Sequence, residues 1–510
     1  MNALRAFFVA VLRLSLSLLL SVSAFSLSLS LLLCFSAASA ATPPPNIVWI
    51  IADDMSPDTA AYGLRDVKTP HLDRLAAEGR HYTRAYATAP VCSSSRSAFI
   101  LGTSQITTGL HAHDVENPQP LAAPYRHLPA LLRDAGWFVT NAAAPGTMRS
   151  GRLITKAKTH YNFAHDPAQM FDGNDWRKRK SGQPFFAQFQ ITEPHRPFPI
   201  PATYDPAKLA GLTLPPNYPD HPLMRRDWYA YQRSVETVDQ RVGAILAQLE
   251  AAGVLENTLV FFFADHGRPM PWGKQWLTVE GLHVPLLVRG PGVTAGSVES
   301  RLVSLIDLAP TALAQAALPA PSWMDGRALL GATFPDRPHV FAARDRCGDA
   351  YDRIRAAITP THVLVQNFFP DVPRFNWSGY KEASYPGLPL LRVLHAAGQL
   401  DPLQNLWCQP TRAAFELYDL HRDPAGLHNI ATAPTSATTV ATLRRALDEW
   451  VRSTGDRGAL PDPATEPTKA EIQKSKRADY QRTWQARLKN PEPTDTERLA
   501  WWEKSYGLTP

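Results

Sequence analysis

The amino-acid sequence predicts an α/β fold with a mostly parallel central sheet, followed by a smaller C-terminal α+β domain with an antiparallel sheet. The first observation is a set of short, unbroken apolar runs such as NIVWIIA at 46–52, which is typical of strands buried on both faces. The second is the alternation of these runs with amphipathic helical segments. The third is a change beyond Pro335 to shorter segments with few long helices.

The elements of the larger part follow from local signals. Thr69 and Pro70 mark the start of a helix that Gly79 ends, with Leu72 and Leu75 on its apolar face. Further strands are expected within 136–143, 184–192 and 257–267, because each is a short run of apolar and β-forming residues. A long helix is expected at 229–252, where apolar residues recur at helical spacing.

The predicted domain organisation has four parts. Residues 1–41 are read as a signal peptide and residues 42–335 as the main domain. Residues 336–460 form the smaller domain, with strands expected at 339–345, 353–359, 361–368 and 414–420 and a helix at 439–451. Residues 461–510 are rich in charge, proline and tryptophan without a clear core periodicity, and we expect a surface tail.

The first 41 residues differ from the rest in composition. Two arginines precede a long Leu/Ser/Val/Phe run that ends in Ala38-Ser39-Ala40, the layout of a secretory leader with a small-residue cleavage site. An uncleaved membrane anchor is the alternative, since the run is long for a leader. We therefore expect a periplasmic or secreted protein that contacts a membrane only if the leader stays attached.

Charge and cysteine content narrow the function classes. The chain of 510 residues carries a formal charge of +6, and loss of Arg5 and Arg13 with the leader would leave +4. This is too little to argue for a nucleic-acid partner in a chain of this size. Of the four cysteines, Cys347 and Cys408 could pair in an exported protein or stay as free thiols.

Acidic residues follow two of the predicted strands. Asp53 and Asp54 come directly after VWIIA, and Asp265 and His266 come directly after LVFFFA. Ligands in open α/β sheets gather at the carboxyl ends of strands, so these groups are expected to meet. Three carboxylates at one edge repel one another unless a cation neutralises them. The oxygen-rich donor set favours Ca²⁺, with Mg²⁺ as the alternative, over zinc. Taken alone, Asp53-Asp54 would be interpreted as a helix cap after a strand; the second acidic strand end makes a metal site the better interpretation.

The stretch APVCSSSRSAFILG at 89–102 resembles the motif of the type I, formylglycine-dependent sulfatases, which have an alkaline-phosphatase-like α/β/α sandwich fold. The resemblance continues in order through most of 46–433, in the stretches IVWIIADD, TPHLDRLAAEG, KTHYNF, EPHRPF, FFFADHG, GKQWLTVEGLHVPLLVRGPG and ELYDLHRDPAGLHNIA. KTHYNF and RDRCGDAYDRIR are most similar to the heparan N-sulfatase, or sulfamidase, branch. The ordered set is far more specific than any single motif.

This resemblance implies that Cys92 is oxidised to formylglycine, whose hydrate is the nucleophile. Ser95 and Arg96 match the core that the formylglycine-generating maturation enzyme recognises, whereas Ser94 stands where the family has Pro or Ala. It further implies that Asp53, Asp54, Asp265 and His266 hold the metal together with the modified residue 92. Many relatives carry Asn at the position of His266.

The resemblance also assigns roles to five basic residues. Arg96 would stabilise the hydrate and the metal site, and Lys158 and His160 would contact the sulfate and the nucleophile. Two residues at this spacing on a strand project to one face. His195 is the candidate acid for the leaving atom, and Lys274 would bind a sulfate oxygen. Out of this context Lys158 and His160 could equally form a solvated basic turn, and His195 and Lys274 would be ordinary exposed residues.

Two other groups of residues remain open from the sequence. His111 and His113 either line the pocket or are simply exposed. Arg344, Asp345 and Arg353 either contact a sugar or form a structural ion-pair cluster.

The expected function is hydrolysis of sulfate esters or N-sulfate groups of sulfated carbohydrates, with a glycosaminoglycan unit as the leading substrate. The alternatives are a phosphatase or phosphonate hydrolase of the same superfamily and a non-catalytic glycan-binding relative in which Ser94 blocks maturation.

Overall fold

The computed structural model describes residues 9, 44–149, 152–154, 157–331, 336–458 and 467–508. The predicted signal peptide lies outside the described residues except for residue 9. Residues 45–510 form one packing unit, and the fold described below is that of this unit. Within the described ranges, we find no helix with the length and hydropathy that a membrane span requires.

The central sheet has seven strands among the described residues, in the order β10-β2-β9-β8-β1-β7-β4. Strands β4, β7, β1 and β8 run parallel, β9 is antiparallel to both of its neighbours, and β2 and β10 pair in parallel. The bounds are β1 Asn46–Ala52, β2 Arg80–Tyr82, β4 Phe138–Ala143, β7 Phe185–Ile191, β8 Thr258–Ala264, β9 Leu286–Arg289 and β10 Ser297–Glu299. Every residue of β1, β7 and β8 is buried, as their apolar runs predict.

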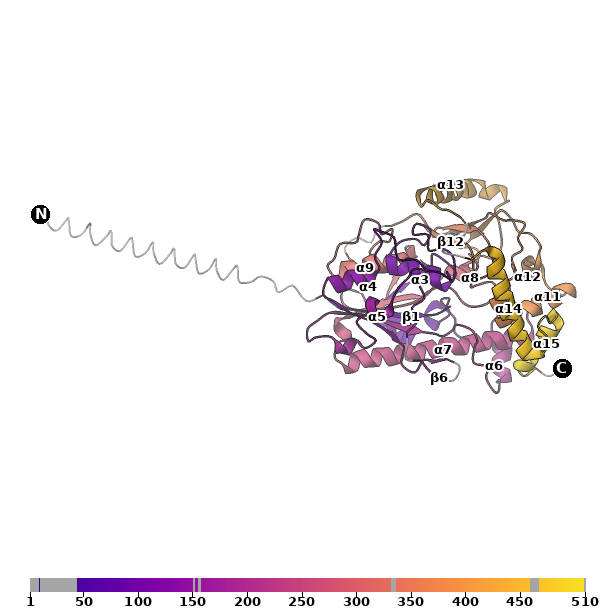
Figure 1. Ribbon diagram of the computed structural model, residues 1–510, viewed down its shortest axis with the longest axis horizontal. Coiled ribbons are helices and arrows are strands. Elements are labelled where there is room, and N and C mark those ends of the chain that lie inside the picture. The colour runs from indigo at the N-terminus through magenta and orange to yellow at the C-terminus, as the bar shows by residue number, and fades with distance from the viewer. Residues whose placement is uncertain are drawn as a thin grey trace. The chain divides into compact units, whose positions relative to one another are not determined.

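Helices cover both faces of this sheet. Figure 1 shows α7 (Pro222–Ala251) on one face and α3 (Cys92–Leu101), α4 (Leu128–Asp134) and α9 (Leu308–Gln315) on the other, and α2 (Pro70–Glu78) packs against α7. Helix α7 begins seven residues before the predicted start, because His221 caps it and Pro222 occupies its first position. The predicted α/β sandwich is therefore confirmed.

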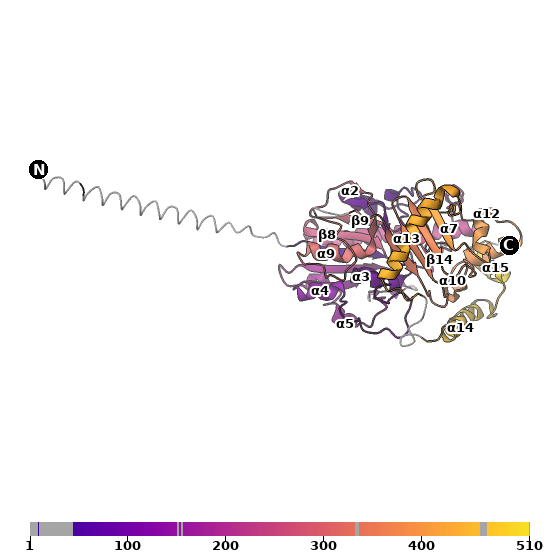
Figure 2. The ribbon, with the colours of Figure 1, turned by 90° about the horizontal axis from the view of Figure 1, so that it is seen from above.

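The second sheet is antiparallel and contains four of the described strands in the order β12-β13-β14-β15. They span Val340–Arg344, Ile354–Ile358, His362–Asn367 and Phe415–Asp419, within the four predicted segments. Helix α13 (Ala437–Ser453) lies across this sheet in Figure 2 and packs on β13 and β14. The antiparallel second sheet is thus confirmed.

Within the described residues 467–508 the chain forms the helices α14 (Lys469–Leu488) and α15 (Asp495–Ser505). Helix α14 packs against α10 (Gly379–Ser384), and α15 packs against α11 (Gly387–Ala396). Shorter described elements are β3 Ala85–Tyr86, β5 Met148–Arg149, β6 Arg152–Leu153, β11 Val303–Ser304, α5 Pro167–Met170, α6 Pro206–Gly211, α8 Val279–Leu282 and α12 Pro402–Asn405.

Candidate active site

The acidic residues meet because their strands are neighbours in register. Ala52, the last residue of β1, pairs with Ala264, the last residue of β8. Asp53, Asp54 and Asp265 therefore emerge side by side, and the backbone N–H of Asp54 donates to Asp265 Oδ1 at 3.0 Å. All three carboxylates are buried. Asp54 has a φ of 64°, a left-handed conformation that non-glycine residues seldom adopt and that is common at functional sites.

Cys92 is the first residue of α3, and its thiol lies over these acids. Its Sγ is 3.3 Å from His266 Nε2, 3.5 Å from Lys274 Nζ and 3.6 Å from Asp54 Oδ1. Burial alone would raise the pKa of the thiol, but Lys158, Lys274 and His266 outweigh burial and hold the pKa well below its ordinary value. The position thus favours an anionic or strongly polar group over an inert buried thiol.

Cationic side chains neutralise the carboxylates. Lys158 Nζ donates to both oxygens of Asp53 at 2.7 and 2.8 Å, and Lys274 Nζ donates to both oxygens of Asp54 at 2.7 and 3.0 Å. Burial is the largest single influence and opposes ionisation of both carboxyls. Lys158 with Arg96 and His195 at Asp53, and Lys274 with His195 and His266 at Asp54, together outweigh burial and keep both pKa values below the usual range.

Arg96 joins the two strand ends. Its Nε donates to Asp265 Oδ2 at 2.9 Å, its Nη2 to Asp53 Oδ1 at 3.2 Å and its Nη1 to Gln190 Oε1 at 2.8 Å. Burial dominates at Asp265 and raises its pKa to about 7, since Arg96 and His266 offset it only in part.

The sequence argument that only a metal could hold three carboxylates together is therefore too strong, because Arg96, Lys158 and Lys274 already bond them. The donor set nevertheless fits a divalent cation. One ligand atom from each of Asp54, Cys92, Asp265 and His266 lies within 4.8 Å of the others, and Asp53, Asp54 and His195 form a second such group. Sulfur is the one soft donor here, and an oxygen in its place would give the hard set that Ca²⁺ or Mg²⁺ prefers.

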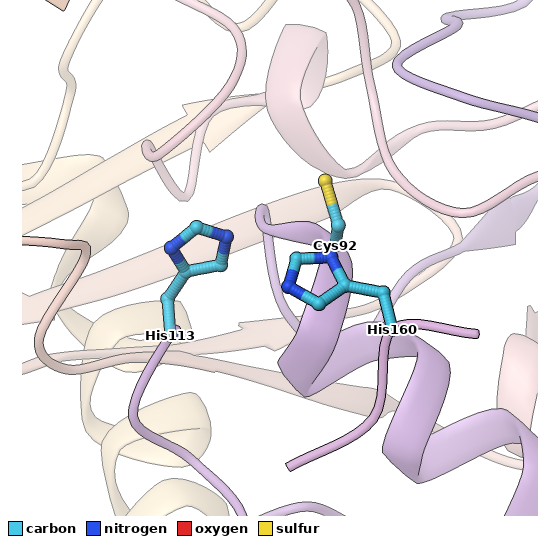
Figure 3. Close-up of side chains that lie close together, drawn as sticks. All are labelled: Cys92, His113 and His160. Atoms are coloured by element: carbon cyan, nitrogen blue, oxygen red, sulfur yellow. The ribbon is translucent and has the colours of Figure 1, made fainter. Parts of the chain in front are cut away.

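Two histidines stand beside the thiol (Figure 3). His113 and His160 each offer a ring nitrogen within 4.8 Å of Cys92 Sγ. Asp114, which the sequence analysis passed over, accepts a hydrogen bond from His160 Nε2 and lies 3.5 Å from His113 Nδ1. The predicted strand at Lys158 and His160 is wrong: residues 157–160 form no regular element, although both side chains reach the same cavity.

His195 approaches the acids from the loop after β7. Its Nε2 is 3.8 Å from Asp54 Oδ2, and its Nδ1 contacts the carbonyl of Arg196 at 2.6 Å. Arg196 is anchored by a buried, bidentate ion pair with Asp227 at 2.6 and 2.9 Å. Burial, assisted by Lys274, lowers the pKa of His195. The ring is thus held in place at the edge of the acidic cluster.

A cavity of about 400 Å³ opens over Cys92, within the size range of small-molecule sites. The predicted residues that line it are Cys92, His113, Lys158, His160, His195 and Lys274. Its opposite wall includes residues from α10 and α14, which carry no recognisable motif. Asp114 directly follows the predicted His113, so sequence reasoning could have included it in the site. The residues of α10 and α14 carry no such signal in the sequence.

The remaining open questions from the sequence have structural answers. His111 does not line the cavity, but its carbonyl accepts from the hydroxyl of Ser94 at 3.0 Å. Arg344 pairs with Asp352 at 2.6 Å, and Arg353 lies 3.6 Å from Asp456, so the ion-pair interpretation holds for this cluster. Cys347 and Cys408 are free thiols.

Solved structures define the class of fold. The protein BT4656, whose structure was solved in complex with its substrate D-glucosamine-2-N,6-O-disulfate, is 18% identical with a TM-score of 0.58, and the match covers 81% of this chain and 99% of that one. The phosphonate monoester hydrolase SpPMH from Silicibacter pomeroyi is 20% identical with a TM-score of 0.57, covering 81% and 96%. These matches establish an alkaline-phosphatase-like α/β fold.

Sequence relatives define the family more narrowly. The sulfatase family model matches residues 45–318. An ulvan-active sulfatase from Formosa agariphila is 31% identical over 475 residues, which is 82% of this chain and 76% of that protein. Human N-sulphoglucosamine sulphohydrolase is 28% identical over 474 residues, which is 81% and 91%. The chain therefore belongs to the sulfatase family, whose members hydrolyse sulfuric esters or sulfamates.

Proposed function

We propose that this protein is an exported sulfatase that removes O- or N-linked sulfate from a sulfated saccharide through a formylglycine hydrate formed from Cys92. The observation that carries the proposal is the position of Cys92. It begins α3 with its Sγ within 3.6 Å of Asp54, His266 and Lys274, and it borders the cavity. Similarity to enzymes that are named for a sulfated saccharide, such as N-sulphoglucosamine sulphohydrolase, supports this class of substrate.

The reaction needs a nucleophile that can be regenerated. A hydroxyl of the hydrate attacks the sulfur atom, the bond from sulfur to the leaving oxygen or nitrogen breaks, and sulfate becomes attached to residue 92. The remaining hydroxyl then loses its proton and forms the aldehyde as sulfate leaves, and water adds to restore the hydrate. Serine or cysteine lacks the second hydroxyl, which explains why a modified residue suits this position.

The surrounding side chains fit the charges that develop. Lys158 and Lys274 are cations beside residue 92, where they can bind sulfate oxygens and stabilise the negative charge of the transition state. His195 and His160 line the same cavity, so either can deliver a proton to the leaving atom; the sequence motif favours His195. The anionic sulfate would raise the pKa of a histidine beside it and so favour the acid form.

Asp53, Asp54, Asp265 and His266, with an oxygen of residue 92, would hold one divalent cation, Ca²⁺ or alternatively Mg²⁺. Bound there, such an ion supplies positive charge to the sulfate and lowers the pKa of a neighbouring hydroxyl. Arg96 then acts as a positioning residue, because it bonds both Asp53 and Asp265 from behind.

The test is release of sulfate by the protein coexpressed with a formylglycine-generating enzyme. Substrates are N-sulfoglucosamine, glucosamine 6-sulfate, an aryl sulfate and an aryl phosphonate. We expect sulfate release that Cys92→Ala abolishes and that Cys408→Ala, a free thiol outside the cavity, leaves intact. Undiminished hydrolysis by Cys92→Ala would refute the nucleophile, and a preference for the phosphonate would favour the phosphonate hydrolase alternative.

Export is a separate part of the proposal and rests on the composition of residues 1–41. We expect the mature chain to begin near residue 42 and to be found in the periplasm or the medium. N-terminal sequencing of fractionated protein checks this, and an intact leader in a membrane fraction would favour the anchor.

A further inference from the structure

Asp114 lines the cavity over Cys92, and the proposed reaction has so far given it no part. It lies in the loop between α3 and α4, and its φ of 54° is a left-handed conformation that non-glycine residues seldom adopt. Its backbone N–H donates to the hydroxyl of Ser93 at 3.2 Å, and its carbonyl accepts from Arg346 Nη2 at 3.4 Å. Because Ser93 directly follows Cys92, these bonds fix the position of Asp114 relative to residue 92.

The carboxylate of Asp114 holds the ring of His160. Its Oδ1 accepts a hydrogen bond from His160 Nε2, whereas His113 Nδ1 lies 3.5 Å from Oδ2, which is long for a hydrogen bond. Both side chains of the bonded pair line the cavity, and 44% of the Asp114 side chain and 31% of the His160 side chain are exposed. The pair therefore stands at the surface that a substrate contacts and is not sealed in the core.

The bond to Asp114 decides what the other ring nitrogen of His160 can do. Nε2 donates to a carboxylate and so carries a proton, which places the lone pair of the neutral ring on Nδ1. Figure 3 shows one nitrogen of this ring turned toward Cys92 and the other turned toward His113, the residue before Asp114. Asp114, His160 and residue 92 thus form a series of orienting acid, base and reacting group, an arrangement that recurs in hydrolases.

The second step of the proposed reaction needs a proton acceptor beside residue 92. When sulfate leaves, the bond from carbon to the sulfate oxygen breaks and sulfate takes that electron pair. The electrons of the remaining O–H bond form the aldehyde, so the proton of that hydroxyl must pass to a base. His195 is the candidate acid of the first step and approaches Asp54 from the loop after β7, which leaves His160 for the second step.

We propose that Asp114 is a positioning residue for the release of sulfate. It keeps His160 Nδ1 turned toward residue 92, where this nitrogen accepts the proton of the hydroxyl that becomes the aldehyde. Asp114 acts through His160 and transfers no proton itself. This inference rests on the proposed function, because it takes residue 92 as a formylglycine hydrate. It implies that loss of Asp114 slows the second step and leaves the first step intact.

The experiment counts the products of the two steps separately. Fully converted full-length protein is mixed in a quench-flow instrument with the substrate that is most active in the sulfate-release assay. The leaving alcohol or amine and the free sulfate are then measured per active site. The variants are Asp114→Gly, because glycine adopts a φ of 54° without strain, and Asp114→Asn, which keeps the size and one acceptor oxygen.

Asp423→Asn is the matched control. Asp423 Oδ2 lies 3.3 Å from His428 Nδ1, so these residues form another pair of an aspartate with a histidine. Neither of them lines the cavity over Cys92. The control therefore removes a carboxylate beside a histidine without touching the site, and it should show wild-type kinetics.

Asp114→Gly should lower kcat about 100-fold, which is the smaller end of what a positioned proton acceptor contributes. KM should fall by the same factor, because kcat/KM reports the first step, which does not use Asp114. One leaving group per active site should appear in a burst before sulfate does. Asp114→Asn should show the same pattern with a smaller loss, and it carries the test if the glycine variant does not fold.

Two results would overturn the proposal while wild-type turnover upholds the proposed function. One is wild-type kinetics in both Asp114 variants. The other is an equal loss of kcat and kcat/KM without a burst, which a merely structural role would produce. If converted wild-type protein released no sulfate from any substrate, the proposed function would fail, and this inference would fail with it.

Discussion

Arg96 should contribute far more to the free energy of unfolding than a surface arginine does, and its burial allows the size of this contribution to be worked out. Its guanidinium is 2% exposed and bonds Asp265 and Asp53, whose side chains are 0% and 4% exposed. Arg96→Ala leaves both carboxylates without that partner, and breaking a buried ion pair costs about 3–5 kcal/mol. Arg74 is a matched control, because it also bonds two carboxylates, those of Glu78 and Glu250, yet is 45% exposed. Its loss should cost at most about 1 kcal/mol.

The assay is denaturant unfolding of wild type, Arg96→Ala and Arg74→Ala in the presence of a chelator. Saturating Ca²⁺ should reduce the penalty of Arg96→Ala, because a bound cation would neutralise the same acids. If Arg96→Ala lost no more free energy of unfolding than Arg74→Ala, the view that Arg96 holds the acidic strand ends together would be refuted.

Three further predictions follow from the site. Ser94→Pro should raise the fraction of Cys92 converted, measured by peptide mass spectrometry, because it restores the family motif; an unchanged fraction would mean that Ser94 is no handicap. The substitution removes two hydrogen bonds of the Ser94 hydroxyl, the one it donates to the carbonyl of His111 at 3.0 Å and the one it accepts from Asn162 Nδ2 at 3.4 Å, whereas the proline ring is tolerated in the first turn of α3. Burial raises the pKa of Asp349 to about 6 despite its bonds from Gly379, so folding stabilises the protonated form. This contribution is complete below the unfolded pKa of 3.8 and is lost as pH rises through 6. Asp349→Asn should therefore stabilise the protein by about 3 kcal/mol at pH 7 and about half as much at pH 5, and equal effects at both pH values would contradict this. Finally, Ca²⁺ should raise the melting temperature of converted protein more than that of unconverted protein, because conversion replaces the soft sulfur of residue 92 by oxygen; equal shifts would argue against residue 92 as a ligand.

Much of the fold could be predicted because its signals are local. The runs that became β1, β7 and β8 are mostly apolar, and the acids at 53, 54 and 265 come directly after two of them. Once β1 is taken to pair in parallel with β8, that pairing alone predicts that the acids lie close together. Cys92 was located by its motif, and the structure adds that it starts a helix directly above those acids.

The wall of the cavity could not be predicted, because it depends on contacts distant in sequence. Helix α14 buries only Ile472, Tyr480 and Trp484 among many charged residues, so its apolar periodicity is weak. Tyr380 lies about 100 residues from Lys476, and only the packing of α10 on α14 brings them to one cavity. Lys158 and Lys274 were expected to bind sulfate, and Arg96 to stabilise the hydrate and the metal site. Their direct bonds to the carboxylates could be found only from the structure.

The central claim is that residue 92 acts as formylglycine, and the mass of one peptide tests it most directly. The peptide containing Cys92 is analysed from protein that hydrolyses a sulfated saccharide, and its modified fraction is compared with the active fraction from titration of the site. The account predicts the mass of formylglycine in a fraction that rises and falls with activity. Full activity in protein whose residue 92 is entirely unmodified cysteine would contradict it.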